Sequence, residues 1–379
     1  MVKLQVSRAI RNEARGAAVA LVMELSILDL VPVRVGQSTS DSFAASHELI
    51  QSADKLGYTR YWVAEHHNMP SIASTMPGAE LMYLGQGTER IRLGSGGVML
   101  PNHAPLAVAE LFSLLAAVYG DRIDLGIGRA PGTDPITSAA MRGHLGEGRM
   151  VDREGRTVDP VEQFPQHVID TLSLMKPEGL HVPLHGGREH VLHATPAAVP
   201  GTQPLPWLLG SSGYSARLAA ELGMPYVFAN HFAAGATTGM KIYRDNFVPG
   251  AYGDKPQTFV TVNAVVSPTE EEAQLRAEPF LLQMSRLRTG GRMEPLRLAG
   301  DDVRSVRTDQ ERMVGEEMSE NWIIGDAASA KAQLEELAGR FEVDEIMIQP
   351  VAGAMEGEGL RQDAARIQSL ELLAAEFLN

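Results

Sequence analysis

The sequence predicts a (β/α)₈ barrel, and three observations support this fold class. Eight short segments rich in aromatic and β-branched residues recur along the chain, and a helical pattern follows each of them. Such βα units favour a parallel sheet, because parallel strands need a crossover connection. No Gly-x-Gly-x-x-Gly follows the first strand, which counts against the competitor, an open doubly wound sheet with a nicotinamide site.

The expected elements alternate in order along the chain. Strands are expected at 24–30, 59–64, 91–98, 122–127, 207–210, 226–229, 258–266 and 345–349. Helices are expected at about 41–56, 77–88, 105–119, 161–175, 213–222, 239–247, from 269 onward, at 327–341 and at 360–377.

Residues at the ends of these segments support the helix assignments. Asp41 or Ser42 is expected to cap the first helix, and Gly57 to end it. Pro105 suits the first position of the third helix, where its missing N–H costs nothing. Thr269 is expected to cap the helix after the seventh strand, and the acids that follow it favour a helix N-terminus.

The regular alternation breaks in three segments. Residues 129–160 and 288–315 lack a clean period, and 177–206 is rich in Pro and Gly with a hairpin expected near 190–193. We therefore expect insertions after strands four and seven, and we expect them to form the walls of a substrate pocket.

Composition excludes several classes of function. The chain has 379 residues, enough for one large α/β domain or two ordinary ones. Its formal charge of −14 disfavours nucleic acid and anionic membrane surfaces as partners, and no apolar run is long enough to span a membrane. The absence of cysteine excludes disulfides, iron–sulfur clusters and thiol catalysis, and it fits the cytoplasm.

The domain organisation is expected to be simple. Residues 1–22 are basic and precede a second methionine, Met23. They are interpreted as an N-terminal extension, disordered or added by an upstream start codon, with a targeting peptide as the alternative. The barrel domain is expected to occupy 23–379.

Four polar residues follow the second expected strand: Glu65, His66, His67 and Asn68. The carboxyl ends of barrel strands are where chemistry takes place. Because neighbouring side chains on a strand point in opposite directions, we expect only one histidine to face the lumen. Glu65 or a main-chain carbonyl can orient its ring, and a neutral imidazole there can exchange a proton near neutral pH. The alternative is a pair of hydrogen-bonded histidines without a catalytic role.

Three glycines interrupt the third expected strand, at Gly94, Gly96 and Gly97. Glycine within a strand often marks the close approach of a ligand or of another backbone. The pattern therefore favours a flat group lying against this strand, with a cis or strained peptide bond at Gly96–Gly97. A barrel made narrow by small residues is the alternative.

Two further strand ends suggest a site for an anion. Arg129 follows the fourth strand, and a guanidinium there suits a phosphate or a carbonyl-rich ring. Ser211, Ser212 and Gly213 follow the fifth strand where a helix begins, and hydroxyls beside helix N-terminal amides suit a phosphate. An exposed arginine and an ordinary serine N-cap are the alternatives.

No metal site is predicted. No regular element aligns the histidines of the irregular 177–206 segment, which are His181, His185, His190 and His193. No Gly-x-Ser-x-Gly motif supports serine hydrolysis.

Taken together, these strand ends resemble those of the bacterial luciferase-like flavin monooxygenase family, from about Met23 to the C-terminus. Four motifs in order carry the resemblance: Tyr-Trp-Val-Ala-Glu-His-His at 61–67, Val-Met-Leu-Pro at 98–101, Asp-Leu-Gly-Ile-Gly-Arg at 124–129 and Leu-Gly-Ser-Ser-Gly at 209–213. Members are barrels that bind reduced FMN or, in one branch, a deazaflavin. The luciferases carry a cysteine at the position of Gly128, so light emission is not expected here.

The resemblance implies roles for individual residues. It implies that Glu65 and His66 are catalytic, with His66 transferring the proton, and that His67 and Asn68 lie in the substrate pocket. It also implies that the Gly96–Gly97 peptide packs on the isoalloxazine ring. The flavin phosphate would be held by Arg129, Ser211, Ser212 and Gly213. The 288–315 segment would be the loop that closes over the flavin.

The function expected from this resemblance is a flavin-dependent monooxygenase that uses O₂ on a small organic substrate. Reduced FMN would come from a separate flavin reductase, because the sequence has no nicotinamide-binding motif. The alternatives are a deazaflavin-dependent dehydrogenase or reductase on the same barrel, and a flavin-binding protein with little activity. The resemblance also implies a homodimer through the second and third expected helices, at 77–88 and 105–119.

Overall fold

Eight parallel strands close into a barrel, which confirms the predicted fold class. The computed structural model describes residues 23–143, 161–184, 186–197, 201–231 and 237–378, so the extension expected at 1–22 lies outside it. Around the ring the order is β1 (Glu24–Asp29), β2 (Arg60–Val63), β3 (Arg92–Ser95), β5 (Ile123–Gly128), β8 (Leu205–Gly210), β9 (Tyr226–Phe228), β10 (Thr258–Val266) and β12 (Glu345–Pro350). Pairing of β12 with β1 closes the ring.

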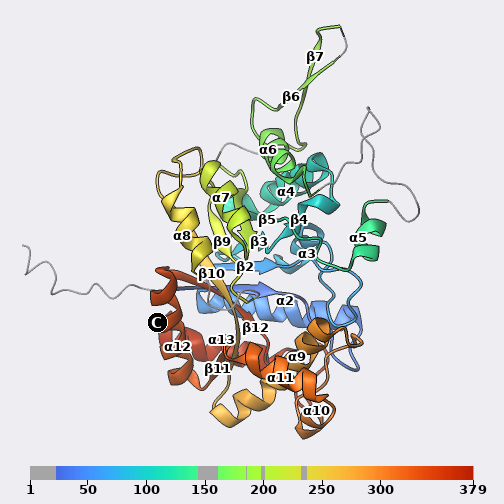
Figure 1. The fold of residues 1–379 in the computed structure, drawn as a ribbon, viewed down its shortest axis with the longest axis vertical. Coiled ribbons are helices and arrows are strands. Elements are labelled where there is room, and N and C mark those ends of the chain that lie inside the picture. Colours follow the sequence, from blue (N-terminus) through green and yellow to red (C-terminus); the bar gives the residue numbers. More distant parts are fainter. Residues whose placement is uncertain (1–22, 144–160, 185, 198–200, 232–236, 379) are drawn as a thin grey trace, which may run out of the picture.

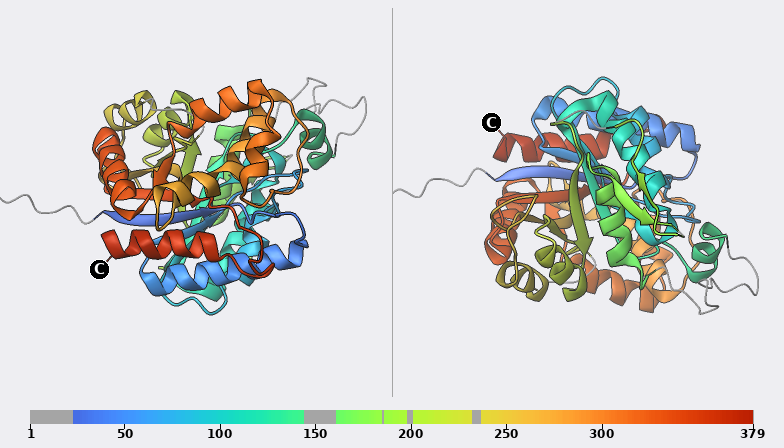
Figure 2. Two further views of the ribbon diagram at one scale, coloured as in Figure 1. Left: turned by 90° about the horizontal axis from the view of Figure 1, so that it is seen from below. Right: turned by 90° about the horizontal axis from the view of Figure 1, so that it is seen from above.

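Helices cover the outside of the barrel (Figures 1 and 2). They are α2 (Thr39–Leu56), α3 (Pro77–Leu84), α4 (Pro105–Tyr119), α5 (Pro135–Met141), α6 (Phe164–Leu174), α7 (Gly213–Glu221), α8 (Thr238–Asp245), α9 (Glu270–Thr289), α10 (Asp301–Ser305), α11 (Asp309–Ser319), α12 (Ala327–Phe341) and α13 (Ala364–Phe377). The last helix, α13, packs beside α2, because the strands that precede them are neighbours in the ring (Figure 2). Within the described parts of the chain, none of these helices is sufficiently long and apolar to cross a membrane.

The third expected strand differs in detail from the prediction, and one strand is additional, whereas the seventh lies at 258–266 as expected. The third is split at a cis peptide bond between Gly96 and Gly97 into β3 and the short β4 (Val98–Met99), and both parts pair with β5. The cis bond itself was expected. An additional strand that was not predicted, β11 (Ile323–Gly325), pairs with the end of β10 outside the ring.

The first helix begins earlier than predicted. Ser38, and neither Asp41 nor Ser42, is its N-cap. The Ser38 hydroxyl accepts a hydrogen bond from the Asp41 N–H, and the Asp41 carboxylate accepts one from the Ser38 N–H. This reciprocal pair is a capping box, which satisfies two main-chain donors that the helix leaves without partners.

The hairpin near 190–193 and the helices expected at 161–175 and from 269 are confirmed, and the irregular segments also contain three helices that were not predicted, α5, α10 and α11. The connection after β5 holds α5, α6 and an antiparallel hairpin of β6 (Leu180–Pro183) and β7 (Glu189–Leu192), which projects at the top of Figure 1. The connection from β10 to β12 holds α9, α10, α11, β11 and α12. That these two connections are insertions stays a prediction.

The strands separate two apolar regions. Their outward side chains pack against the helices, and their inward side chains fill the barrel. The largest inward side chains are Trp62, Trp207, Phe259 and Met347, which form one apolar cluster with Leu28. The ring centroids of Trp62 and Phe259 lie 5.3 Å apart.

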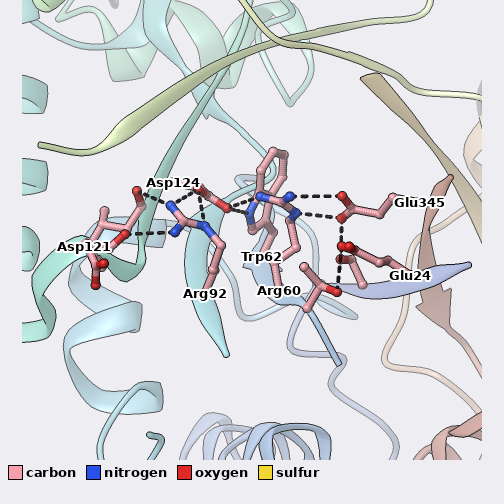
Figure 3. A network of polar contacts seen from close by, with 10 residues as sticks. Glu24, Arg60, Trp62, Arg92, Asp121, Asp124 and Glu345 are labelled. Carbon is pink, nitrogen blue, oxygen red and sulfur yellow. Dashed lines mark hydrogen bonds and ion pairs between the residues drawn. The ribbon is translucent and has the colours of Figure 1, made fainter. Parts of the chain in front are cut away.

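Charged side chains close the amino-terminal end of the barrel (Figure 3). Arg60 donates from Nε to Glu345 at 2.6 Å and from Nη1 to Asp124 at 2.9 Å. Trp62 Nε1 and the Arg92 guanidinium also donate to Asp124. Each buried charge therefore has an opposite partner, which burial requires.

Gly126 illustrates how tightly neighbouring strands approach. A Cβ atom added there would lie 2.0 Å from the Ser95 carbonyl oxygen, a main-chain atom that cannot move aside. We expect Gly126→Ala to lower the free energy of unfolding by about 1–3 kcal/mol, measured by urea denaturation. The matched control is Gly339→Ala on α12, where a Cβ would meet nothing within 4 Å. Gly339→Ala should raise the free energy of unfolding by about 0.5–1 kcal/mol. Equal effects of the two substitutions would contradict a steric clash at Gly126.

Candidate active site

A cavity of about 590 Å³ opens at the carboxyl ends of the barrel strands. Its wall includes residues at or just beyond the ends of several strands, among them Ala64, Gly128, Leu209 and Ala229. Apolar side chains from α9 and the segment after it complete the wall: Phe280, Met284, Leu287 and Met293. The cavity is therefore at the end of the barrel where chemistry takes place in this fold.

The cavity brings together eight of the ten residues that the sequence indicated for a site. They are His66, His67, Asn68, Gly96, Gly97, Arg129, Ser211 and Ser212. The other two, Glu65 and Gly213, do not line it. Gly213 is the first residue of α7, directly after Ser212.

Glu65 lies behind the cavity wall and is completely buried. One carboxylate oxygen, Oε1, accepts hydrogen bonds from His67 Nε2 at 2.9 Å and from His103 Nε2 at 2.8 Å. The other, Oε2, accepts from the Met99 N–H at 2.9 Å. Burial alone would raise the pKa of Glu65, but the hydrogen bonds from His103 and His67 lower it to about 2. Glu65 is thus a buried anion that positions other residues.

His66 and His67 both line the cavity, although only one of them was expected to face the lumen, because β2 ends at Val63 and the chain beyond it is no longer a regular strand. Burial is the main influence on His66. Burial lowers its pKa to about 4, with a further contribution from His67, while Glu65 opposes the shift. In the described parts of the chain, its Nδ1 atom is buried without a hydrogen-bond partner. The ring is therefore neutral at neutral pH, and the partnerless nitrogen can interact with a ligand.

The sequence interpretation missed His231 at the end of β9. His231 lines the cavity, and its Nδ1 is hydrogen-bonded to the Thr261 hydroxyl on β10. Burial lowers its pKa to about 3, and nearby His66 adds to the shift. A signal was available, because Asn230 and His231 are polar residues that follow a strand, as Glu65 and His66 do.

Arg129, Ser211 and Ser212 form a polar part of the wall. The Arg129 guanidinium carbon lies 4.2 Å from the centre of the Tyr214 ring. Among the described residues, no carboxylate forms an ion pair with Arg129. Ser212 is the N-cap residue of α7, yet its side chain makes no capping hydrogen bond. An arginine, hydroxyls and helix amides together suit an anionic group.

The glycines of the third strand have a packing role as well as a place in the wall. A Cβ on Gly96 would lie 2.5 Å from Leu28 Cδ1, and one on Gly97 would lie 2.9 Å from the Gly126 carbonyl oxygen. Larger residues at either position would disturb the barrel. At Gly96 and Gly97 the cavity wall is main chain alone.

No group of three or more potential metal ligands gathers in the parts of the chain that the structure describes. In the β6–β7 hairpin, His181 Nδ1 lies 3.1 Å from Glu189 Oε2, and both side chains are more than half exposed.

A second buried carboxyl group, Glu80 on α3, lies near Glu65. Its Oε1 accepts from the N–H groups of Thr75 at 2.6 Å and Met76 at 2.8 Å. Burial raises its pKa to about 7; the two N–H groups oppose this rise, and the charges of Asp29 and Glu65 add to it. The folded state therefore binds this proton more tightly than the unfolded chain does.

Glu80→Gln should change how stability depends on pH. In the wild type, the free energy of unfolding falls as pH rises from the ordinary pKa of 4.5 to about 7, because the folded state resists losing the Glu80 proton. A glutamine amide would keep an acceptor oxygen for the N–H groups of Thr75 and Met76, and it has no acidic proton to lose as pH rises. The variant should gain about 2–3 kcal/mol relative to wild type between about pH 4 and about pH 8 in urea denaturation. The control Glu48→Gln, on the exposed face of α2, should leave the free energy of unfolding unchanged over this pH range. An equal gain in both variants would contradict the assignment of the raised pKa to Glu80.

Comparison with known proteins identifies the family. The family described as luciferase-like monooxygenase matches residues 23–341. The chain belongs to this family. It is 36% identical over 326 residues to the luciferase-like monooxygenase of Escherichia coli strain K12, covering 85% of this chain and 90% of that protein. It is 34% identical over 256 residues to the N-acetyl-S-alkylcysteine monooxygenase of Bacillus subtilis strain 168, covering 67% and 70%.

Solved structures agree with this membership. The crystal structure of apo-MsnO8 matches this chain with a TM-score of 0.75 at 29% identity, covering 94% of this chain and 98% of that one. The same fold occurs in the oxygenating constituent of 3,6-diketocamphane monooxygenase from Pseudomonas putida, solved with FMN, at a TM-score of 0.65, 16% identity and coverages of 94% and 97%. It also occurs in the coenzyme F420-dependent tetrahydromethanopterin reductase of Methanopyrus kandleri, at a TM-score of 0.62, 15% identity and coverages of 94% and 98%. The family resemblance is thus confirmed, and the chain is a flavin-dependent oxidoreductase.

Proposed function

We propose that this luciferase-like monooxygenase uses reduced FMN and O₂ to oxygenate a small organic substrate in the 590 Å³ cavity. One observation carries the proposal: a single cavity combines a polar wall suited to a phosphate with buried, neutral histidines and an apolar wall. Reduced flavin, when bound, supplies the activation of O₂, and the protein supplies position and a dry environment.

The residues of the polar wall fit an FMN phosphate. Arg129 has a guanidinium without a carboxylate partner among the described residues, and Ser211 and Ser212 offer hydroxyls beside the N-terminal amides of α7. Gly213 contributes its main chain, as the first residue of that helix. At Gly96–Gly97 the wall has no side chains, which suits a flat ring.

The remaining residues would serve the reaction. His66 would accept or return a proton through Nδ1, and Glu65 would act through the histidine that it holds. His67 and Asn68 would contact the substrate. The apolar side chains of α9 and the 288–315 segment would exclude water, which is the role expected of a closing loop.

FMN is favoured over a deazaflavin by the relatives whose names state their reaction. The relatives from Escherichia coli and Bacillus subtilis described above are both named monooxygenases. The alternative is a deazaflavin-dependent dehydrogenase or reductase, as the F420-dependent neighbour of the same fold illustrates. A flavin-binding protein with little activity is the second alternative.

The partners of the enzyme are also part of the proposal. A separate flavin reductase would supply reduced FMN, and the enzyme would act in the cytoplasm as a homodimer through α3 and α4. Supporting the dimer, Tyr83 on α3 is 43% exposed, and Leu114 and Val118 on α4 are 41% and 53% exposed. The cytoplasmic location and the single domain at 23–379 remain predictions.

Oxygen consumption tests the proposal. The protein is mixed with chemically reduced FMN or reduced F420 and a panel of aldehydes, ketones and thioethers, while O₂ uptake and products are followed. We expect FMN-dependent product that carries one atom from isotopically labelled O₂. Substrate reduction by reduced F420 without O₂ uptake would favour the reductase alternative. FMN binding without any product across the panel would favour the second alternative, a flavin-binding protein with little activity.

A further inference from the structure

Glu65 connects the active-site cavity to a second pocket on the other side of its wall. His67 lines the cavity, whereas His103, just after the 3₁₀ turn Leu100–Asn102, lines a pocket of about 70 Å³ between α3 and α4. The rim of that pocket includes Met76, whose side chain is 41% exposed, so the pocket reaches the surface. Both histidines bond to the same oxygen atom of Glu65, at 2.9 and 2.8 Å.

The charge of Glu65 determines the tautomer of both rings. An ionised carboxylate has no proton to donate, so Nε2 of His67 and Nε2 of His103 must each carry the hydrogen. In each neutral ring, Nδ1 is then the nitrogen with a lone pair. A proton taken from the cavity by His67 would therefore go to Nδ1, and the resulting imidazolium would still donate Nε2–H to Glu65.

His66 and His67 consequently have opposite chemical character, although they are adjacent in sequence. His66 has no carboxylate partner, and its burial disfavours the charged ring. His67 has the buried Glu65 carboxylate 2.9 Å from its Nε2, so a proton added at its Nδ1 would have a counterion in direct contact. Adjacent groups in such different environments are a common arrangement for an acid and a base.

We propose that His67 is a second proton-exchanging residue of the cavity, that Glu65 is its positioning residue, and that His103 couples the charge of His67 to the outer pocket. The catalytic part of this proposal rests on the proposed function. The charge coupling does not, because it depends only on the three side chains.

The coupling follows from one carboxylate serving two imidazoles. The single negative charge of Glu65 stabilises one imidazolium, and a second positive charge on the same oxygen is repelled by the first. Protonation of His103 from the outer pocket therefore opposes protonation of His67. Other titratable groups around the trio are His66, Glu80 and, in the cavity wall, Asp134.

Nuclear magnetic resonance of the full-length protein with ¹⁵N-labelled histidine tests the coupling without any cofactor. We expect His67 and His103 to show the Nε2–H tautomer at neutral pH. His103→Gln keeps a neutral donor for Glu65 and removes the competing charge, so the midpoint of the His67 titration should move to higher pH. Glu65→Gln removes the counterion, so the pKa of His67 should fall. The control, His47→Gln on α2, should leave the His67 titration unchanged.

An unchanged His67 titration in His103→Gln would overturn the coupling, as would an Nδ1–H tautomer at either ring. If Glu65→Gln does not fold, His103→Gln and the tautomer of the wild type still decide the question.

The catalytic part is tested by turnover with reduced FMN. His103→Gln should move the pH profile of kcat in the same direction as the His67 pKa, and His67→Gln should abolish that pH dependence. A pH profile unchanged in both variants would overturn the role of His67. If the wild type shows no oxygenation at all, the proposed function has failed, together with the role assigned to His67 in it. The nuclear magnetic resonance titration tests the charge coupling independently of turnover.

Discussion

Replacing Arg129 with methionine is expected to weaken FMN binding by about 10- to 100-fold while leaving riboflavin binding unchanged. The two ligands share the ring system, and riboflavin lacks the phosphate. A charge-assisted hydrogen bond contributes about 1.5–3 kcal/mol, and methionine keeps much of the length and apolar surface of the arginine stem. Fluorescence titration of each ligand measures the difference.

The matched control is Arg217→Met on α7, because this exposed arginine does not line the cavity. This variant changes the net charge equally, so it removes any long-range electrostatic contribution from the comparison. If Arg129→Met lowered the affinity for FMN and for riboflavin equally, Arg129 would contact the ring system and not the phosphate. If neither affinity changed, Arg129 would not be part of the flavin site.

Replacing Arg60 with leucine is expected to lower the free energy of unfolding by about 3–5 kcal/mol, the largest stability change expected here. Arg60 lies between Glu345 and Asp124 inside the barrel (Figure 3). Asp124 would keep Arg92 and Trp62 as partners. Among the described residues, Glu345 would keep only the Ser26 hydroxyl, at 2.5 Å. A buried carboxylate without its cation accounts for the loss.

Urea denaturation measures this loss, and an exposed ion pair provides the control. Lys241→Leu on α8 removes a partner of Asp245 at 2.8 Å, where both side chains are more than half exposed, and should leave the unfolding midpoint unchanged. If Arg60→Leu were as stable as wild type, apolar packing against Trp207 and Phe259 would have replaced the ion pairs.

Local chemistry predicted much of the fold. The helix expected at 105–119 was confirmed at both ends, because Pro105 and Gly120 mark them in the sequence. The strand β11 was missed, since three residues are too few to show a period. The helix α11 was also missed, although Thr308 and Glu311 form a capping box that the sequence displays.

The candidate site could be predicted in outline only. The barrel gathers its strand ends, so polar residues after several strands were expected to meet, as His66 and Arg129 do in one cavity. Which way each side chain points depends on packing from distant segments. Glu65 turns away from the cavity because His103 and the Met99 N–H, both from the connection after β3, bind its carboxylate. No local pattern contains that information.

The pairing of β1 with β12 has a consequence for synthesis on the ribosome. The first strand emerges early, but its partner, Glu345–Pro350, emerges near the end of translation. Until then, the nascent barrel stays open, with two unpaired edges that can join another chain. Chaperone protection of those edges during elongation, and rapid removal of truncated chains, would therefore matter more for this protein than for one whose neighbouring strands are all consecutive.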